Sequence, residues 1–137
     1  MKRALILMLV LAVALPLAST AAGCGDSPNA VNLRLTAGVK GALRHAFLAA
    51  NPGARAELVP GRTYYGLHVG IQYAVATFAV PGRTAYPAIF SDGGSGRWRL
   101  LRVTHGGVCS GVVPVDLIQT WWLVHWRGGC YVEPPAM

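Results

Sequence analysis

Acidic residues, lysine and cysteine are all scarce in this chain. Its 137 residues contain five acidic and twelve basic side chains, only two of the basic ones are lysines, and there are three cysteines. No two carboxylates lie at a spacing that would pair them for general acid and base catalysis; the five are Asp26, Glu57, Asp92, Asp116 and Glu133. No glycine-rich segment precedes a Lys-Ser or Lys-Thr pair, so the common phosphate-binding loop is excluded. These absences favour a binding or structural protein over an enzyme.

The N-terminus has the pattern of a secretory signal peptide. Lys2 and Arg3 are basic, Ala4 to Leu15 is an apolar run, and small residues follow Pro16. The apolar run is too short for an ordinary membrane-spanning helix. We therefore expect residues 1–23 to be a signal peptide and the protein to be exported.

The segment Ala21-Ala22-Gly23-Cys24 resembles a bacterial lipoprotein box, although that motif usually has leucine where this chain has Ala21. The resemblance implies that the Cys24 thiol receives a diacylglyceryl group and becomes a lipid anchor. Residues 24–32 would then be the anchor and a flexible tether, which holds the protein on the outer face of the cytoplasmic membrane. Two alternatives stay open, secretion after Ala22 or Gly23 and an uncleaved N-terminal anchor.

If Cys24 carries lipid, Cys109 and Cys130 remain as an even pair in an oxidising compartment. This predicts a disulfide between them. Closing a loop of about 20 residues would stabilise the fold by roughly 3 kcal/mol.

Cys109 also lies in a pattern typical of a hydrolase nucleophile. Gly107-Val-Cys109-Ser-Gly111 has the spacing of a nucleophile elbow, and Asp116 and His125 follow in the expected order. That elbow requires a helix directly after the nucleophile, whereas Val113-Pro114 interrupts the chain here. The pattern is therefore weak evidence for an enzyme.

A metal site is the other chemistry that the cysteines permit. His105-x3-Cys109 and His125-x4-Cys130 supply four residues that could bind zinc, but the cysteines would do so only as free thiolates, and there is no Cys-x2-Cys pair. A small secreted hydrolase or metal-dependent enzyme using His105, His125 and Cys109 stays an alternative. Our expectation is no catalytic residue, no metal and no cofactor.

Hydrophobic periodicity predicts a single α+β domain over residues 33–137. A helix begins near Thr36 and ends at Asn51-Pro52-Gly53, and a short C-terminal helix begins near Pro114. Strands are expected at residues 54–59, 63–69, 71–80, 86–91 and 98–104. We expect an antiparallel meander of about four strands covered by the N-terminal helix, in a cystatin-like or similar architecture. Residues 123–126 fit either helix or strand.

The order of several short motifs resembles small exported domains of high-GC bacteria. These motifs are Tyr73-Ala-Val-Ala-Thr-Phe78, then Gly96-Arg-Trp-Arg99, then Cys109 with Val113-Pro-Val-Asp-Leu-Ile118 and a tryptophan before the second cysteine. The resemblance covers residues 36–130. It implies a fold and no catalytic residues.

Basic and aromatic side chains are the features with binding potential. Loss of Lys2 and Arg3 with the signal peptide lowers the formal net charge from +7 to +5. Arginines surround Trp98 and are candidates for anion binding; they are Arg97, Arg99 and Arg102. In an exported protein, their partners would be anionic envelope polymers or lipid headgroups and not nucleic acid.

An aromatic group near the C-terminus has two interpretations. Its members would pack in the core beside the disulfide, or stack on sugars or a membrane interface; they are Trp121, Trp122, Trp126 and Tyr131. Taken together, the sequence predicts an exported, lipid-anchored envelope binding or structural module whose ligand it does not identify. An inhibitor of a secreted hydrolase is a further alternative.

Overall fold

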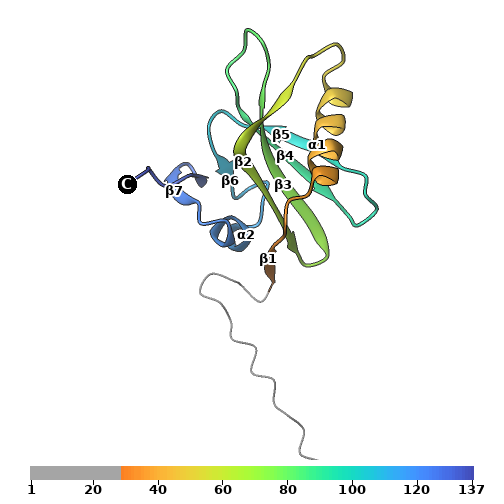
Figure 1. Cartoon of the computed structure of the whole chain (residues 1–137). Helices are drawn as coiled ribbons and strands as arrows, with labels where there is room; N and C mark the ends of the chain where they lie inside the picture. The colour runs from red at the N-terminus through yellow and green to blue at the C-terminus, as the bar shows by residue number, and fades with distance from the viewer. Residues whose placement is uncertain (1–28) are drawn as a thin grey trace, which may run out of the picture.

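The computed structural model describes residues 29–137, so the signal peptide and the Cys24 anchor lie outside the described residues. The described chain is mostly β, with two antiparallel sheets and two helices (Figure 1). One sheet has five strands in the order β1-β2-β3-β4-β5, and the other has three in the order β6-β8-β7. The prediction of an α+β, cystatin-like meander of four strands is therefore wrong.

The five-stranded sheet contains β1 (Ala30–Asn32), β2 (Glu57–His68), β3 (Ile71–Ala79), β4 (Pro87–Asp92) and β5 (Arg99–Val103). The strands predicted at residues 71–80, 86–91 and 98–104 are confirmed to within a residue or two. The two segments expected at 54–59 and 63–69 form the single strand β2, whose register shifts between Leu58 and Thr63. β1 lies within the predicted tether, so the ordered domain begins before residue 33.

Helix α1 (Ala37–Ala50) begins and ends where the sequence predicts. The Thr36 hydroxyl accepts a hydrogen bond from the Val39 amide at 3.2 Å and caps its first turn. Its buried side chains Leu43 and Phe47 pack against one face of the five-stranded sheet, where Phe47 stacks on Phe78 with ring centroids 4.2 Å apart. The side chains buried between α1 and the sheet form the first of two hydrophobic clusters.

The opposite face of the five-stranded sheet is covered by the C-terminal part of the chain. This part contains β6 (Val108–Cys109), α2 (Val115–Thr120), β7 (Val124–Arg127) and β8 (Cys130–Val132). Leu117, Ile118 and Trp121 are buried there against Val75 and Ile89 of the sheet. A short helix was expected here, with residues 123–126 open to either helix or strand, and the second sheet is the main difference from that expectation.

The residues left open as helix or strand belong to β7. Trp122 has a positive φ of 60°, a conformation incompatible with helix continuation, and it separates α2 from that strand. Among residues 29–137, neither helix has the length and apolar content needed to cross a bilayer.

Successive residues of β3 contribute to different cores. Ala74, Ala76 and Phe78 belong to the cluster under α1, whereas Val75 belongs to the cluster under α2. A strand buried on both faces reads as a continuous apolar run and not as an alternating one. The run from Ile71 to Ala79 has this character, and it places β3 at the centre of the domain.

Candidate functional site

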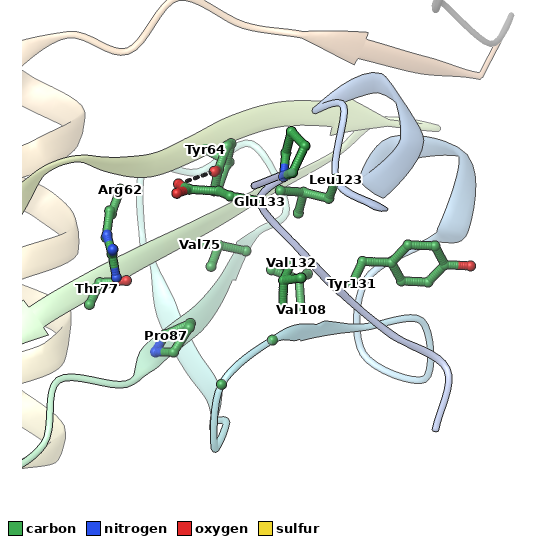
Figure 2. Close-up of a pocket in the computed structure, with 13 residues that line it drawn as sticks. Arg62, Tyr64, Val75, Thr77, Pro87, Val108, Leu123, Tyr131, Val132 and Glu133 are labelled. Carbon is green, nitrogen blue, oxygen red and sulfur yellow. Dashed lines mark hydrogen bonds between the residues drawn. The ribbon is translucent and has the colours of Figure 1, made fainter. Parts of the chain in front are cut away.

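A pocket with a volume of about 330 Å³ lies between the five-stranded sheet and the C-terminal segments (Figure 2). Its size is at the lower end of the range for small-molecule sites. β2, β3 and the start of β4 form one wall, and β6, β8 and the residues after β8 form the other. The walls combine apolar side chains such as Val75, Val108 and Leu123 with the polar side chains of Arg62, Tyr64 and Glu133.

The Tyr64 hydroxyl donates a hydrogen bond to the Glu133 carboxylate at this pocket, as Figure 2 shows. The Tyr64 ring also packs against Trp121, with ring centroids 5.8 Å apart. Burial, the hydrogen bond to Glu133 and the negative charge of Glu133 together raise the pKa of Tyr64, and the nearby charge of Arg62 opposes them. The Tyr64 phenol is therefore neutral at physiological pH and acts as a donor.

Arg62 brings a positive charge to the same pocket. It follows Gly61, which has a positive φ of 74°, inside the irregular part of β2 where the register shifts. The Arg62 side chain is exposed, and no carboxylate among residues 29–137 lies within salt-bridge distance of it; Arg44 pairs with Glu57, and Asp116 is hydrogen-bonded to His68. Thr77 adds a buried hydroxyl to the lining.

The arginines singled out from the sequence lie elsewhere, at the β5 edge of the five-stranded sheet. Arg97, Arg99 and Arg102 are all exposed. Arg99 pairs with Ser91 and Arg102 with Ile89, and the shift between these pairs leaves Leu101 as the extra residue of a bulge. Arg99 and Arg102 therefore share the sheet face opposite α1, while Arg97 precedes the strand. None of the three lines the pocket described above.

The predicted disulfide is present. The sulfur atoms of Cys109 and Cys130 are bonded, and the two residues are direct partners in the antiparallel pairing of β6 with β8. Because both thiols are consumed, neither the nucleophile nor the zinc-thiolate interpretation fits this structure.

The histidines of those alternative sites pack on two different tyrosines. The His105 ring packs edge-on against Tyr86 at 4.9 Å, and the His125 ring packs against Tyr131 at 5.5 Å. No group of three or more His, Cys, Asp or Glu side chains in the described part of the chain is placed to hold a metal ion.

The C-terminal aromatic residues do not form one cluster. Trp121 is buried in the core under α2, whereas Trp122 is 67% exposed and Trp126 is 44% exposed. The Arg127 guanidinium lies 4.0 Å from the centre of the Trp126 ring, within the range of a cation–π contact.

Two carboxylates make contacts across more than 40 positions of the sequence that no local pattern predicts. Glu133 accepts a hydrogen bond from Tyr64 across 69 positions. Asp116 lies in the first turn of α2, and its Oδ2 is 3.1 Å from Nε2 of His68, across 48 positions. The only local feature at the first contact is that Glu133 directly precedes Pro134 and Pro135. Comparison with protein families, curated proteins and solved structures finds no match to this chain.

Proposed function

We propose that this chain is an exported, lipid-anchored protein of the cell envelope whose folded domain binds a small ligand in the pocket between its two sheets. The ligand would carry an apolar part and an anionic group. The pocket is the observation on which this proposal depends, because it joins apolar walls to the exposed Arg62 cation.

The compartment is supported by two independent features. The sequence before residue 24 has the signal-peptide and lipoprotein-box pattern. The Cys109–Cys130 disulfide is a bond that persists in oxidising compartments and is rare in the reducing cytosol. An envelope location explains both the pattern and the bond.

The chemistry of the ligand follows from the pocket lining. Val75, Val108 and Leu123 would cover an apolar chain or ring, and burial of that surface would supply most of the affinity. Arg62 is the one basic side chain among the residues that line the pocket, so its guanidinium is the group that would bind an anion. A carboxylate or phosphate bound by arginine accepts two parallel hydrogen bonds.

A thermal-shift titration tests this proposal. We expect octanoate to raise the thermal midpoint and octanol, its uncharged counterpart, to raise it less. At ten times the dissociation constant a ligand adds about 1.4 kcal/mol, which corresponds to roughly 5 °C for a domain of this size. Arg62→Ala should remove the octanoate effect, and Arg55→Ala is the matched control because Arg55 is also exposed but lies outside this pocket. Equal shifts in the two variants would reject the pocket as the anion site.

The anchor is tested separately by intact mass and phase partitioning. The wild-type chain should carry a diacylglyceryl increment on Cys24 and enter a detergent phase, and Cys24→Ala should remain unmodified. A mature protein whose mass lacks that increment would reject the lipid anchor without affecting the ligand experiment.

A further inference from the structure

Three features of the described chain meet at one end of the five-stranded sheet (Figure 1). The first strand begins there at Ala30, the β2–β3 turn at Val69-Gly70 lies beside it, and the β4–β5 loop follows at the same level because Asp92 pairs with Gln72. We call this the turn end of the sheet. It is the end at which residues 1–28 join the described domain.

The turn end exposes apolar side chains that the two cores do not use. Val69 is 69% exposed, and three other apolar residues at this end are between 42% and 46% exposed; they are Val31, Ile71 and Val115. The hydrogen bond between His68 and Asp116, at 3.1 Å, holds the start of α2 against this turn, so Val115 lies at the same end as Val69. Apolar side chains grouped at one end of a domain mark a contact with a partner or a membrane.

Val69 is an unusual residue for its position. The two turn residues Val69 and Gly70 have φ values of 46° and 77°, as a two-residue hairpin turn requires. Asn-Gly and Asp-Gly suit such a turn, whereas a β-branched residue is strained in the left-handed region. An exposed valine here stabilises neither the core nor the turn, which points to a role in contacting something outside the domain.

The charges at the turn end favour an anionic partner. Arg97 and Arg99 are exposed beside the β4–β5 loop, and neither forms an ion pair with a carboxylate of the described chain. The nearest carboxylates are already engaged. Asp92 is 3% exposed and accepts hydrogen bonds from the Ser95 and Gly96 amides at 3.1 and 2.8 Å, and Asp116 is paired with His68.

The connection to the N-terminal segment identifies the partner as a bilayer. The Val69 amide donates a 3.3 Å hydrogen bond to the carbonyl oxygen of Asn29, so the turn is attached directly to the start of the described chain. Asn29 is five positions after Cys24, and a fully extended chain over five residue steps spans at most about 18 Å. A lipid on Cys24 would therefore keep the turn end close to the headgroups.

We propose that the turn end docks on the membrane, with Val69, Ile71, Val31 and Val115 at the bilayer interface and Arg97 and Arg99 on anionic headgroups. This inference rests on the proposed lipid anchor. In this orientation Arg102, farther along β5, contributes less than the other two arginines. In this orientation the turn end of the larger sheet contacts the bilayer, and neither face of that sheet does.

Hydrogen exchange of the full chain in lipid nanodiscs tests the orientation. In discs containing phosphatidylglycerol, the amides of residues 69–72 and 95–99 should exchange more slowly than in neutral phosphatidylcholine discs. Two arginines near an anionic surface should favour the docked state by roughly 30-fold over neutral discs. The β3–β4 turn at the opposite end, around Arg83, should exchange equally in both discs.

Two variants separate docking from folding. Val69→Asn creates an Asn-Gly turn, so it should raise the thermal midpoint and yet reduce the protection of residues 69–72. Arg97→Glu with Arg99→Glu should remove the dependence on lipid charge, whereas the control Arg83→Glu should not. Equal protection in neutral and anionic discs for the wild-type chain would overturn the proposal, as would protection that depends on protein concentration, because that would indicate a second copy at the turn end.

Failure of the anchor gives a different result from failure of the docking. An unlipidated chain would lack the mass increment on Cys24 and, once its signal peptide is removed, would no longer be tethered to the discs. A lipidated chain that stays on the discs but exchanges freely at residues 69–72 would retain the anchor and contradict the orientation.

Discussion

Tyr64 and Glu133 join the two halves of the domain by a single hydrogen bond. Tyr64 lies on β2 of the larger sheet, and Glu133 directly follows β8, the central strand of the smaller sheet. The contact closes one side of the pocket and attaches the C-terminal segment to β2.

Tyr64→Phe should release this attachment while keeping the ring that packs on Trp121. We expect a loss of about 1–2 kcal/mol in the free energy of unfolding, since the bond has a charged acceptor and is partly exposed. Urea denaturation measures the loss. Glu133→Gln is the companion variant, and the double variant should cost no more than the larger single change if the two residues act only through each other.

The same residue predicts a dependence on alkaline pH. The pKa of Tyr64 is raised in the folded state, so the folded protein retains a proton that the unfolded chain loses above about pH 10. The stability due to Tyr64 is thus complete below pH 10 and decreases as the pH rises through the folded pKa. Unfolding measured from pH 8 to 11.5 should show this decrease, and it should be smaller in Tyr64→Phe. Parallel curves for the two proteins would contradict the assignment.

Asp92 is expected to stabilise the β4–β5 loop at neutral pH and not in acid. Burial alone would raise its pKa, but hydrogen bonds from the Gly96 and Ser95 amides and the Ser95 hydroxyl outweigh burial and lower it. Asp92→Ala should cost about 1–3 kcal/mol at pH 7. Because the folded pKa is below the unfolded one, this contribution is present above about pH 4 and is lost as the pH falls through the folded pKa. Denaturation at pH 3 should therefore show a smaller difference between the two proteins than at pH 7.

Cys130→Ser should destabilise the protein by about 3 kcal/mol, since the bond to Cys109 closes a loop with a sequence separation of 21. Thermal denaturation under non-reducing conditions measures the change. Cys109→Ser should behave alike, and the double variant should match either one. A double variant that loses twice as much would mean that the two cysteines also act independently of their bond.

Gly66→Ala tests the close approach of β1, β2 and α2. A methyl group there would lie 2.6 Å from Leu117 Cδ1 and 2.8 Å from the Val31 carbonyl oxygen. The leucine end can rotate away, but the backbone oxygen cannot, so we expect a loss of about 1–3 kcal/mol. Gly41→Ala is the control, because it lies in α1 with open space around it and should stabilise by about 0.5–1 kcal/mol.

Local patterns in the sequence predict the elements but not the way they combine. The limits of α1 follow from the Thr36 cap and the Asn51-Pro52-Gly53 break, and β3 follows from its β-branched and aromatic run. The smaller sheet has strands of two, four and three residues, too short to display an alternating pattern. The fold class was therefore predicted wrongly, because these short strands form a second sheet that no local pattern indicates.

The candidate pocket could not be predicted for a related reason. Arg62 and Tyr64 approach Glu133 only after the C-terminal segment has folded across the larger sheet. No local spacing in the sequence carries that information. The disulfide could be predicted from the sequence, because the number of cysteines and an oxidising compartment are sufficient to predict it and no three-dimensional geometry is needed.

The central position of β3 makes the tryptophans of this protein separate optical reporters of its two cores. Trp121 is buried on the α2 side of the sheet, and Trp98 packs on the α1 side, where it contacts Tyr65 edge-on at 5.8 Å. The other two tryptophans are exposed and can be replaced by phenylalanine. In such a background, Trp98 and Trp121 fluorescence would reveal whether the layers on the two sides of β3 separate from it together or one after the other.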